Sequence, residues 1–489
     1  MRKTRPALAT AALLLGTALA ALELNVVGTA MPTLVAQLGG LRLYGLVFSA
    51  YLLTSTVTLP LFGRLADLRG RRPVYLAAIA LFLLGSALCG TAPSMTALVG
   101  FRALQGLGAG GVVPITMTIF GDLYPAERRA LVQGLFSTVW GVSSVLGPLL
   151  GGFLVTYISW RWVFWVNLPT GLLAAGLFAA TYHGRVERDA DSPGLDVRGT
   201  VLLSCCLVCL IVGLQGIEGS ASWSWPLLVG AGVLAALFLV HERRAAAPLI
   251  PLDLFRDRAM SVTSLSGLPL GGVLFGVVTF VPLFVQGVLH GSPTQAGLAL
   301  VPLSVVWTGA TFATGPLVRL LGYRPVVLLG SLCCAVGAAG LLLLAGPGPG
   351  RHGAIVVVGA GMGLNLTASL IAVQDAMPWH LRGVATALLQ FARVIGGMIA
   401  VTTLGALVTA RFARRMGSGS LRPGVFLDPA RWPSLPPRTL ETARRALAGS
   451  VRLSFWATAG LGAAVLLINL AFPPLHVENA TRRTKAAVE

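Results

Sequence analysis

Charged residues are scarce in this chain of 489 residues: only 11% are Asp, Glu, Lys or Arg, whereas 55% are hydrophobic. Soluble globular domains carry about 25% charged residues, so the composition excludes a soluble protein and indicates a chain that crosses a membrane repeatedly. Lysine occurs only as Lys3 and Lys485. The net charge of +19 comes from arginines scattered through short links between apolar runs. This excludes a nucleic-acid-binding protein, because such proteins gather their basic residues on one face.

Groups for covalent or metal chemistry are also scarce. The six cysteines lie inside apolar runs, where they serve as small apolar residues, so neither a disulfide framework nor a metal cluster is expected. None of the six histidines lies in the core of a predicted helix, which argues against a histidine proton relay. Since the sequence offers no nucleophile, metal site or pair of acids at one depth, we expect no enzyme, no cofactor and no metal.

Long apolar runs, in contrast, are abundant. A helix needs about 20 apolar residues to span a bilayer. We therefore predict an all-α integral membrane protein with fourteen transmembrane helices, at residues 7–31, 43–62, 73–92, 95–120, 130–157, 163–182, 199–217, 225–241, 260–285, 294–315, 325–345, 353–375, 384–409 and 452–472.

Arginines are divided unevenly between the two sides of this topology. Links on the side of Met1 carry clusters such as that in Gly63–Pro73, whereas the short links on the other side carry only Arg42, Arg161 and Arg351. Basic residues are retained on the cytoplasmic side of a membrane, so we predict that both termini are cytoplasmic.

The predicted external loop 410–450 departs from this rule, because it holds eight arginines between Arg411 and Arg445. Its Gly-, Pro- and Ser-rich middle predicts an irregular loop. The segment Thr439–Ala448 is interpreted as a short amphipathic helix on the membrane surface.

Two segments of the chain are repeated at nearly one offset. Gly63–Pro73 (GRLADLRGRRP) matches Gly315–Pro325 (GPLVRLLGYRP) 252 residues later, and Asp122–Arg129 (DLYPAERR) matches Asp375–Arg382 (DAMPWHLR) 253 residues later. An internal repeat of this size predicts two homologous bundles around a central site. We predict two pseudo-symmetric six-helix bundles at 1–183 and 259–489, joined by a linker with two inserted helices at 184–258.

Five motifs follow one another along the chain: GRLADLRGRR (63–72), LVGFRALQGLGAG (98–110), GVSSVLGPLLGG (141–152), WRWVFWVNLP (160–169) and GSPTQAGLALVP (291–302). Together they resemble the motifs of the major facilitator superfamily, and in particular its fourteen-helix drug:proton antiporter branch. The resemblance covers nearly the whole chain and implies the fold of that superfamily and export of drugs against protons. The sequence departs from the branch at Glu23, where Asp is usual.

The first and third motifs carry expected roles. The first resembles the family's loop between helices 2 and 3, and we interpret it as a gate in which Asp67 pairs with an arginine or a helix N-terminus in one state. An ordinary basic loop with one solvated acid is the alternative. Its gating residues are Gly63, Asp67, Gly70, Arg71 and Arg72. The third resembles the antiporter motif, although generic packing of small residues would look the same. Its residues are Gly141, Gly147, Pro148, Gly151 and Gly152.

Glu23 is the carboxylate that lies deepest in the membrane, where a charge is costly and indicates a functional site. Arg102 lies at a similar depth, since each is about eight residues from the outer end of its helix. In the implied fold these two helices line the same half of the cavity. We interpret Glu23 as the proton-coupling site and Arg102 as the residue that tunes it. A permanent buried pair that only orders the bundle is the alternative.

The remaining polarity of the cavity must come from residues without charge and from Arg393. Arg393 could contact substrate or form hydrogen bonds with the carbonyl groups at helix ends. For each candidate, helix packing is the alternative role. The candidate substrate contacts are Asn25, Gln105, Trp140, Gln286, Trp307, Asn365, Gln390 and Arg393.

These observations and the resemblance predict a proton-coupled antiporter that exports lipophilic, cationic drugs or toxic compounds by alternating access. It would be a monomer in a bacterial cytoplasmic (inner) membrane, with protons and small molecules as partners and no cofactor beyond the proton gradient. The alternatives are a dedicated exporter of one metabolite or lipid with the same fold and a sensor that does not transport.

Overall fold

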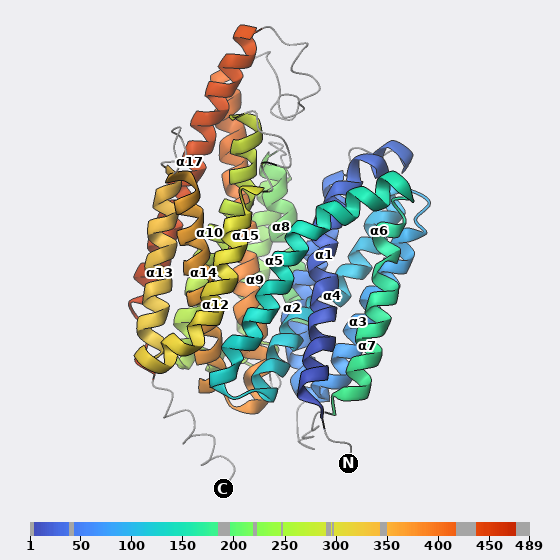
Figure 1. Cartoon of the computed structure of the whole chain (residues 1–489), viewed down its shortest axis with the longest axis vertical. Coiled ribbons are helices and arrows are strands. Elements are labelled where there is room, and N and C mark those ends of the chain that lie inside the picture. The colour runs from blue at the N-terminus through green and yellow to red at the C-terminus, as the bar shows by residue number, and fades with distance from the viewer. Residues whose placement is uncertain are drawn as a thin grey trace.

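The computed structural model describes residues 4–38, 44–183, 196–218, 223–245, 248–289, 295, 298–342, 350–416 and 437–475. Every regular element in these ranges is a helix, which confirms the predicted all-α class (Figure 1). The helices are α1 (Pro6–Leu38), α2 (Tyr44–Arg69), α3 (Arg71–Gly90), α4 (Met95–Leu123), α5 (Ala126–Tyr157), α6 (Trp162–Trp165), α7 (Asn167–Thr181), α8 (Val197–Glu218), α9 (Ser224–Glu242), η2 (Leu252–Arg256), α10 (Arg258–Gly287), α12 (Val301–Leu321), α13 (Tyr323–Gly340), α14 (Gly350–Ala376), η4 (Trp379–Leu381), α15 (Arg382–Met416) and α17 (Pro437–Asn469).

Eleven helices among the described residues are long and apolar enough to cross a membrane. The count of fourteen stays a prediction. Continuous helices of this length satisfy their own backbone polar groups, which is what a segment in lipid requires.

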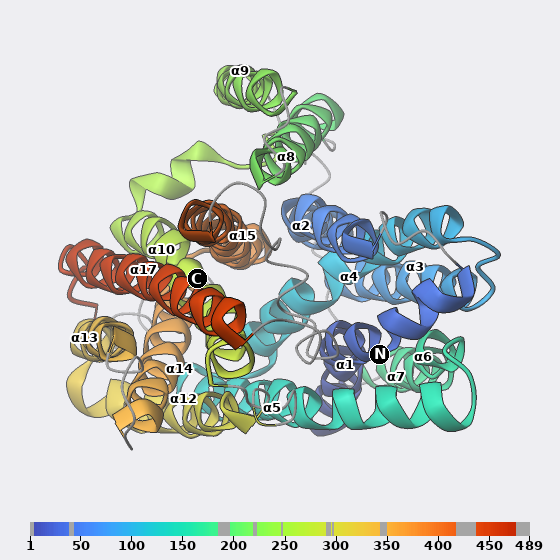
Figure 2. The ribbon, with the colours of Figure 1, turned by 90° about the horizontal axis from the view of Figure 1, so that it is seen from above.

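The helices pack as two bundles with the same internal arrangement (Figure 2). In the first bundle α4 packs on α2 and α3, and α1 packs on α5 and α7. In the second bundle α14 packs on α12 and α13, and α10 packs on α15 and α17. The bundles meet where α2 contacts α15 and where α5 contacts α12. The domain boundaries at residues 183 and 259 stay a prediction.

Glycines at matching positions let the helices of each bundle touch backbone to backbone. A Cβ on Gly108 of α4 would overlap the backbone N of Phe82 in α3, and a Cβ on Gly361 of α14 would lie 2.6 Å from the backbone N of Cys334 in α13. The two glycines are 253 residues apart and their neighbours 252 residues apart, as in the sequence repeat. The packing therefore confirms the internal repeat.

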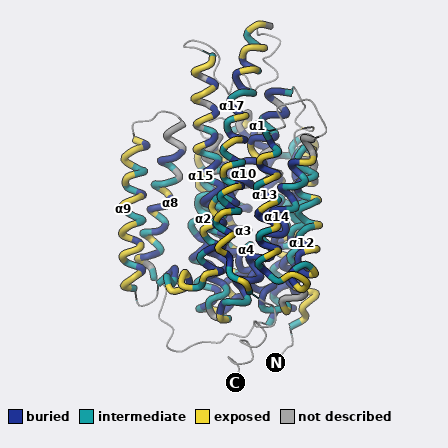
Figure 3. Tube along the Cα trace, turned by 90° about the vertical axis from the view of Figure 1, so that its left-hand side faces the viewer, coloured by how far each residue is buried: buried dark blue, intermediate teal, exposed yellow. Residues whose placement is uncertain are grey.

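The pair α8 and α9 lies beside the two bundles, next to α2 and α15 (Figures 2 and 3). The outward side of α9 is apolar and exposed, with Val229, Val233 and Leu237 on it. An apolar face of this kind suits contact with lipid.

The structure corrects the prediction for the loop 410–450. Helix α15 continues to Met416 and α17 begins at Pro437, so both ends of that segment are helical. The prediction of a separate surface helix at Thr439–Ala448 is wrong, because these residues belong to the first turns of α17. Where a helix leaves the bilayer it carries charged residues, so a hydropathy profile does not detect it there. On these turns of α17, Arg445 forms an ion pair with Glu441, four residues earlier, at 2.9 Å.

Candidate functional site

A polar network lies buried inside the first bundle. Glu23 of α1 is 1% exposed and Arg102 of α4 is 0% exposed, and Arg102 Nη1 donates to Glu23 Oε1 in a buried ion pair. The structure thus brings together Glu23 and Arg102, the two residues that were paired on their similar depth and on the fold implied by the resemblance. An ion pair away from water needs further hydrogen bonds to offset the cost of desolvation.

Two side chains supply such hydrogen bonds, Asn167 and Gln105. Asn167 at the start of α7 donates to Glu23 Oε2 at 2.6 Å and also lies 2.9 Å from Ser86 Oγ of α3. Gln105, one turn below Arg102 on α4, accepts from Arg102 Nη1 at 2.7 Å. Both carboxylate oxygens of Glu23 are therefore engaged within the bundle.

Arg102 also contacts two residues of α2, and one of its guanidinium nitrogens has no hydrogen-bond partner among the described residues. Its Nε donates to the carbonyl of Val47 at 3.3 Å, and its guanidinium lies 4.3 Å from the centre of the Tyr51 ring, as in a cation–π contact. Within the described part of the chain, its Nη2 is buried without a hydrogen-bond partner. A guanidinium with a free donor can change partners without leaving its pocket.

Three residues of this network have no predicted role: Asn167, Ser86 and Tyr51. Asn167 lies in the quoted run WRWVFWVNLP and is the one polar amide in it. This amide could have indicated a buried polar contact, because an amide inside an apolar helix needs a polar partner. Gln105 is a member of this network, and its predicted contact with substrate stays a prediction.

The second group of predicted residues lies at the end of the molecule that we call the inner end. It is defined by the segment Gly63–Pro73, and Thr4 and Leu475, the first and last described residues, lie there as well. Asp67 of α2 accepts from the backbone N–H groups of Gly383 at 3.2 Å and Val384 at 2.8 Å. These two residues open α15, so a carboxylate of the first bundle caps a helix of the second.

Arginines reinforce this closure. Arg71 forms ion pairs with Asp122 and, at 3.6 Å, with Asp67, and its Nη2 donates to the carbonyl of Trp379 in the second bundle at 3.2 Å. Its guanidinium also lies 4.4 Å from the centre of the Trp379 ring. Arg71 thereby joins three elements at once.

A further ion pair crosses between the bundles at this end. Arg129 at the start of α5 pairs with Asp375 at the end of α14, and the Tyr323 hydroxyl donates to the other oxygen of Asp375 at 2.5 Å. Both charged residues stand in the repeated sequence D-x-x-P-x-x-x-R, although the repeat did not reveal that they pair across bundles. Asp375 contacts Arg129 and Tyr323 rather than Arg393.

The other gating residues shape the contact. A Cβ on Gly63 would lie 2.6 Å from the Cβ of Ala387, so glycine lets α2 approach α15. Gly70 has φ +87°, a backbone conformation that favours glycine, and it turns the chain sharply from α2 into α3. Arg72 Nη2 donates to the carbonyl of Ala179 at 2.6 Å and holds α3 to α7.

The predicted antiporter motif lies on α5 beside the second bundle. A Cβ on Gly141 would make ordinary contacts with Ser304 at 3.7 Å and Thr308 at 3.8 Å on α12, while a Cβ on Gly152 would meet nothing within 4 Å. Gly147 and Gly151 are buried, and the side chain of Pro148 lies outside the described residues. Of these glycines, Gly141 lies at the contact between the bundles.

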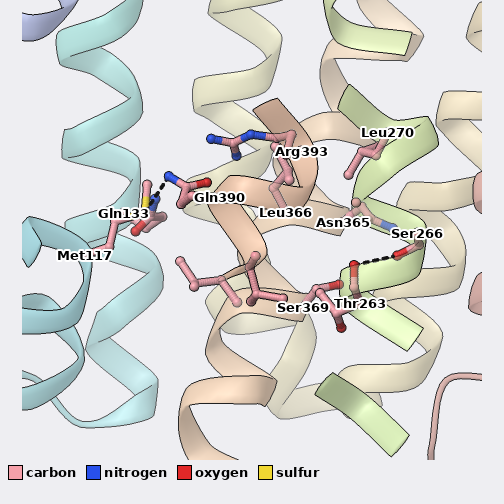
Figure 4. A pocket seen from close by; sticks show the side chains of 13 residues that line it. Met117, Gln133, Thr263, Ser266, Leu270, Asn365, Leu366, Ser369, Gln390 and Arg393 are labelled. Atoms are coloured by element: carbon pink, nitrogen blue, oxygen red, sulfur yellow. Dashed lines mark hydrogen bonds between the residues drawn. The ribbon is translucent and has the colours of Figure 1, made fainter. Parts of the chain in front are cut away.

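A cavity lies between α4 and α5 of the first bundle and α10, α14 and α15 of the second (Figure 4). Three predicted substrate contacts line it: Asn365, Gln390 and Arg393. Trp140 and Trp307 are half-buried elsewhere, Trp140 beside Phe136 and Trp307 at the edge of the second core. The side chains of Asn25 and Gln286 lie outside the described residues.

Comparison with known proteins shows the protein family to which the chain belongs. The family model of the Major Facilitator Superfamily matches residues 13–401. The chain belongs to the Major Facilitator Superfamily, a family of multi-pass membrane transporters.

Its relatives narrow the class further. The chain is 37% identical to the multidrug transporter protein MdtP of Bacillus subtilis over 80% of this chain and 73% of that protein. It is 32% identical to multidrug resistance protein 3 of the same organism over 83% of this chain and 80% of that protein. These relatives support efflux transport.

Solved structures share the fold. The human organic anion transporter MFSD10 has a TM-score of 0.66 at 14% identity, covering 96% of this chain and 100% of that one. The proton:xylose symporter XylE has a TM-score of 0.65 at 15% identity, covering 96% and 97%. At this identity the likeness concerns the fold alone.

Proposed function

We propose that the protein is a proton-coupled antiporter that exports lipophilic compounds, cationic ones among them, by alternating access. The observation that carries the proposal is the buried Glu23, whose two oxygens are engaged by Arg102 and Asn167. A carboxylate at this depth is a candidate proton site, and both multidrug relatives support a role in efflux.

The coupling follows from electrostatics. A proton on Glu23 removes its negative charge and leaves Arg102 without its counter-ion, so Arg102 must find another partner or move. Because Arg102 also holds α4 to the carbonyl of Val47 on α2, its movement would disturb the packing of the bundle. Reciprocity then requires that proton and substrate disfavour each other's binding.

The bundles would alternate between two closures. The contacts of Asp67, Arg71 and Arg129 across the inner end support a state closed at that end. We propose that this end is cytoplasmic, that the protein lies in a bacterial cytoplasmic membrane as a monomer, and that the proton gradient is its only energy source.

Transport by purified protein in liposomes tests the proposal. An imposed pH gradient should drive export by the wild type, Glu23→Gln should abolish it, and Glu23→Asp should largely retain it because the acid remains. Full gradient-driven export by Glu23→Gln overturns the proposal. A panel of cationic, neutral and anionic compounds in the same assay separates a multidrug exporter from one dedicated to a single compound.

A further inference from the structure

We propose that the cavity between the bundles binds a carboxylate, or a comparable anionic group, on the transported compound, and that Arg393 is its principal contact. The inference rests on the proposed transport function and names a substrate class for it: lipophilic zwitterions, bound more tightly than simple cations.

The cavity has one ionised lining residue. Its walls are Met117, Gln133, Thr263, Ser266, Gly267, Leu270, Asn365, Leu366, Ser369, Leu370, Leu389, Gln390 and Arg393, of which only Arg393 carries a charge. No hydrogen bond or ion pair joins the Arg393 guanidinium to another residue in the part of the chain that the structure describes.

The depth of Arg393 makes this charge unusual. It lies eleven residues after the first residue of α15 at Arg382, which is about 16 Å along the helix axis and close to the middle of a bilayer. A guanidinium at that depth requires a counter-charge or several acceptors. Protein does not supply them among the described residues, so an anionic group of a ligand fits the position.

Other lining groups can donate hydrogen bonds as well. The hydroxyl oxygens of Thr263 and Ser369 are buried and have no hydrogen-bond partner within the described ranges. Both lie on the wall of the cavity formed by α10 and α14 (Figure 4). A hydroxyl is a donor as well as an acceptor, so these two groups can donate to further oxygen atoms of a ligand whose anionic group contacts Arg393.

Glu23 does not balance Arg393. It is absent from the cavity wall, and both of its oxygens are held by Arg102 and Asn167. A compound with only a positive charge therefore finds no counter-charge in this cavity and binds more weakly, whereas a zwitterion can place its anionic end on Arg393 and its apolar ring system along Leu270 and Leu366.

A matched pair of dyes tests the inference directly. Tetramethylrhodamine is a zwitterion with a free carboxylate, and its methyl ester has the same cationic ring system without that charge. Fluorescence anisotropy with the purified protein should show at least about tenfold tighter binding of the free acid, as expected for a hydrogen-bonded charge pair. Arg393→Gln should remove that preference by weakening the binding of the acid, without weakening the binding of the ester.

Two further variants make the result specific. Arg393→Lys keeps the charge but loses the forked donor, so it should retain an intermediate preference. Arg411→Gln removes an exposed arginine from the same helix and should retain the full preference. Each variant is first checked for a monodisperse elution profile. If Arg393→Gln does not fold, an Arg393→Lys variant with the full wild-type preference overturns the inference.

The inference is overturned if the wild type binds neither dye, if it binds the ester as tightly as the acid, or if Arg393→Gln keeps the preference. The assay contains no proton gradient. A negative result in this assay therefore does not bear on the role of Glu23 in proton coupling. Conversely, if transport proves independent of Glu23, the preference for the free acid can still be observed.

Discussion

At the scale of single residues, the buried network around Glu23 shows how far sequence alone reaches. Counting residues along two helices predicts that Glu23 and Arg102 share a depth, and the structure joins them. Depth says nothing about which way a side chain points around its helix. For that reason two residues could not be predicted: Asn167, which bonds Glu23 from α7, and Ser86 of α3, which accepts a hydrogen bond from Asn167.

Asn167 provides a test of this network. Asn167→Ala removes a hydrogen bond to a buried carboxylate, which costs about 1.5–3 kcal/mol. We expect a lower midpoint of thermal unfolding in detergent and a large loss of gradient-driven transport. Thr170 lies one turn further along α7, and its hydroxyl donates to the backbone carbonyls of Val166 and Asn167, so Thr170→Ala should behave like the wild type. Equal behaviour of the two variants contradicts the network.

At the scale of elements, glycine determines how closely the helices pack. The runs around Gly108 and Gly361 superficially match dinucleotide-binding fingerprints, but the structure places both inside long helices, where the glycines are contacts between helices. The sequence repeat predicted that the two bundles would be alike. It could not predict that α15 and α17 extend beyond the apolar runs. Hydropathy identifies the apolar segment that spans the bilayer and does not detect the polar turns at either end of it.

Four glycine variants test the repeat. Gly108→Ala and Gly361→Ala each push a methyl group against a neighbouring backbone, which costs about 1–3 kcal/mol. Gly100 and Gly353 lie at equivalent positions on the same two helices, where an added methyl group would meet nothing within 4 Å. Alanine there should be neutral or slightly stabilising. Thermal unfolding should therefore separate the first pair from the second, and similar midpoints for all four variants would refute equivalent packing.

At the scale of the whole molecule, the inner end is closed by an asymmetric set of contacts. Asp67 caps α15, but the equivalent position 252 residues later is Arg319, which is exposed. Likewise Asp122 pairs within its own bundle whereas Asp375 pairs across to Arg129. The motif predicted that Asp67 would have a partner. The partners of Asp375 depend on how the two bundles face each other, which no local pattern contains.

Asp67→Asn tests this closure. The amide removes the charge at the N-terminus of α15 and weakens the closed state by about 1–2 kcal/mol, a factor of roughly 5–30 in population. Spin labels at Arg69 and Leu321, exposed residues at the inner ends of α2 and α12, should report a new population at longer distance. The native cysteines are replaced for this measurement.

Asp253→Asn is the matched control for that variant. Asp253 is an exposed acid in η2 that pairs with Arg256 of the same short helix at 3.1 Å, so its substitution should leave the distance distribution unchanged. If Asp67→Asn also leaves the distribution unchanged, the cap on α15 does not hold the inner end closed.

The central claim is that Glu23 carries the proton that is exchanged for substrate. Its most direct test records the pH inside liposomes that are loaded with substrate and then diluted into substrate-free buffer of equal pH. Wild-type protein should acidify the lumen as substrate leaves, because protons enter in exchange. Glu23→Gln should release substrate without acidification. Acidification by Glu23→Gln at the wild-type ratio of protons to substrate would contradict the account.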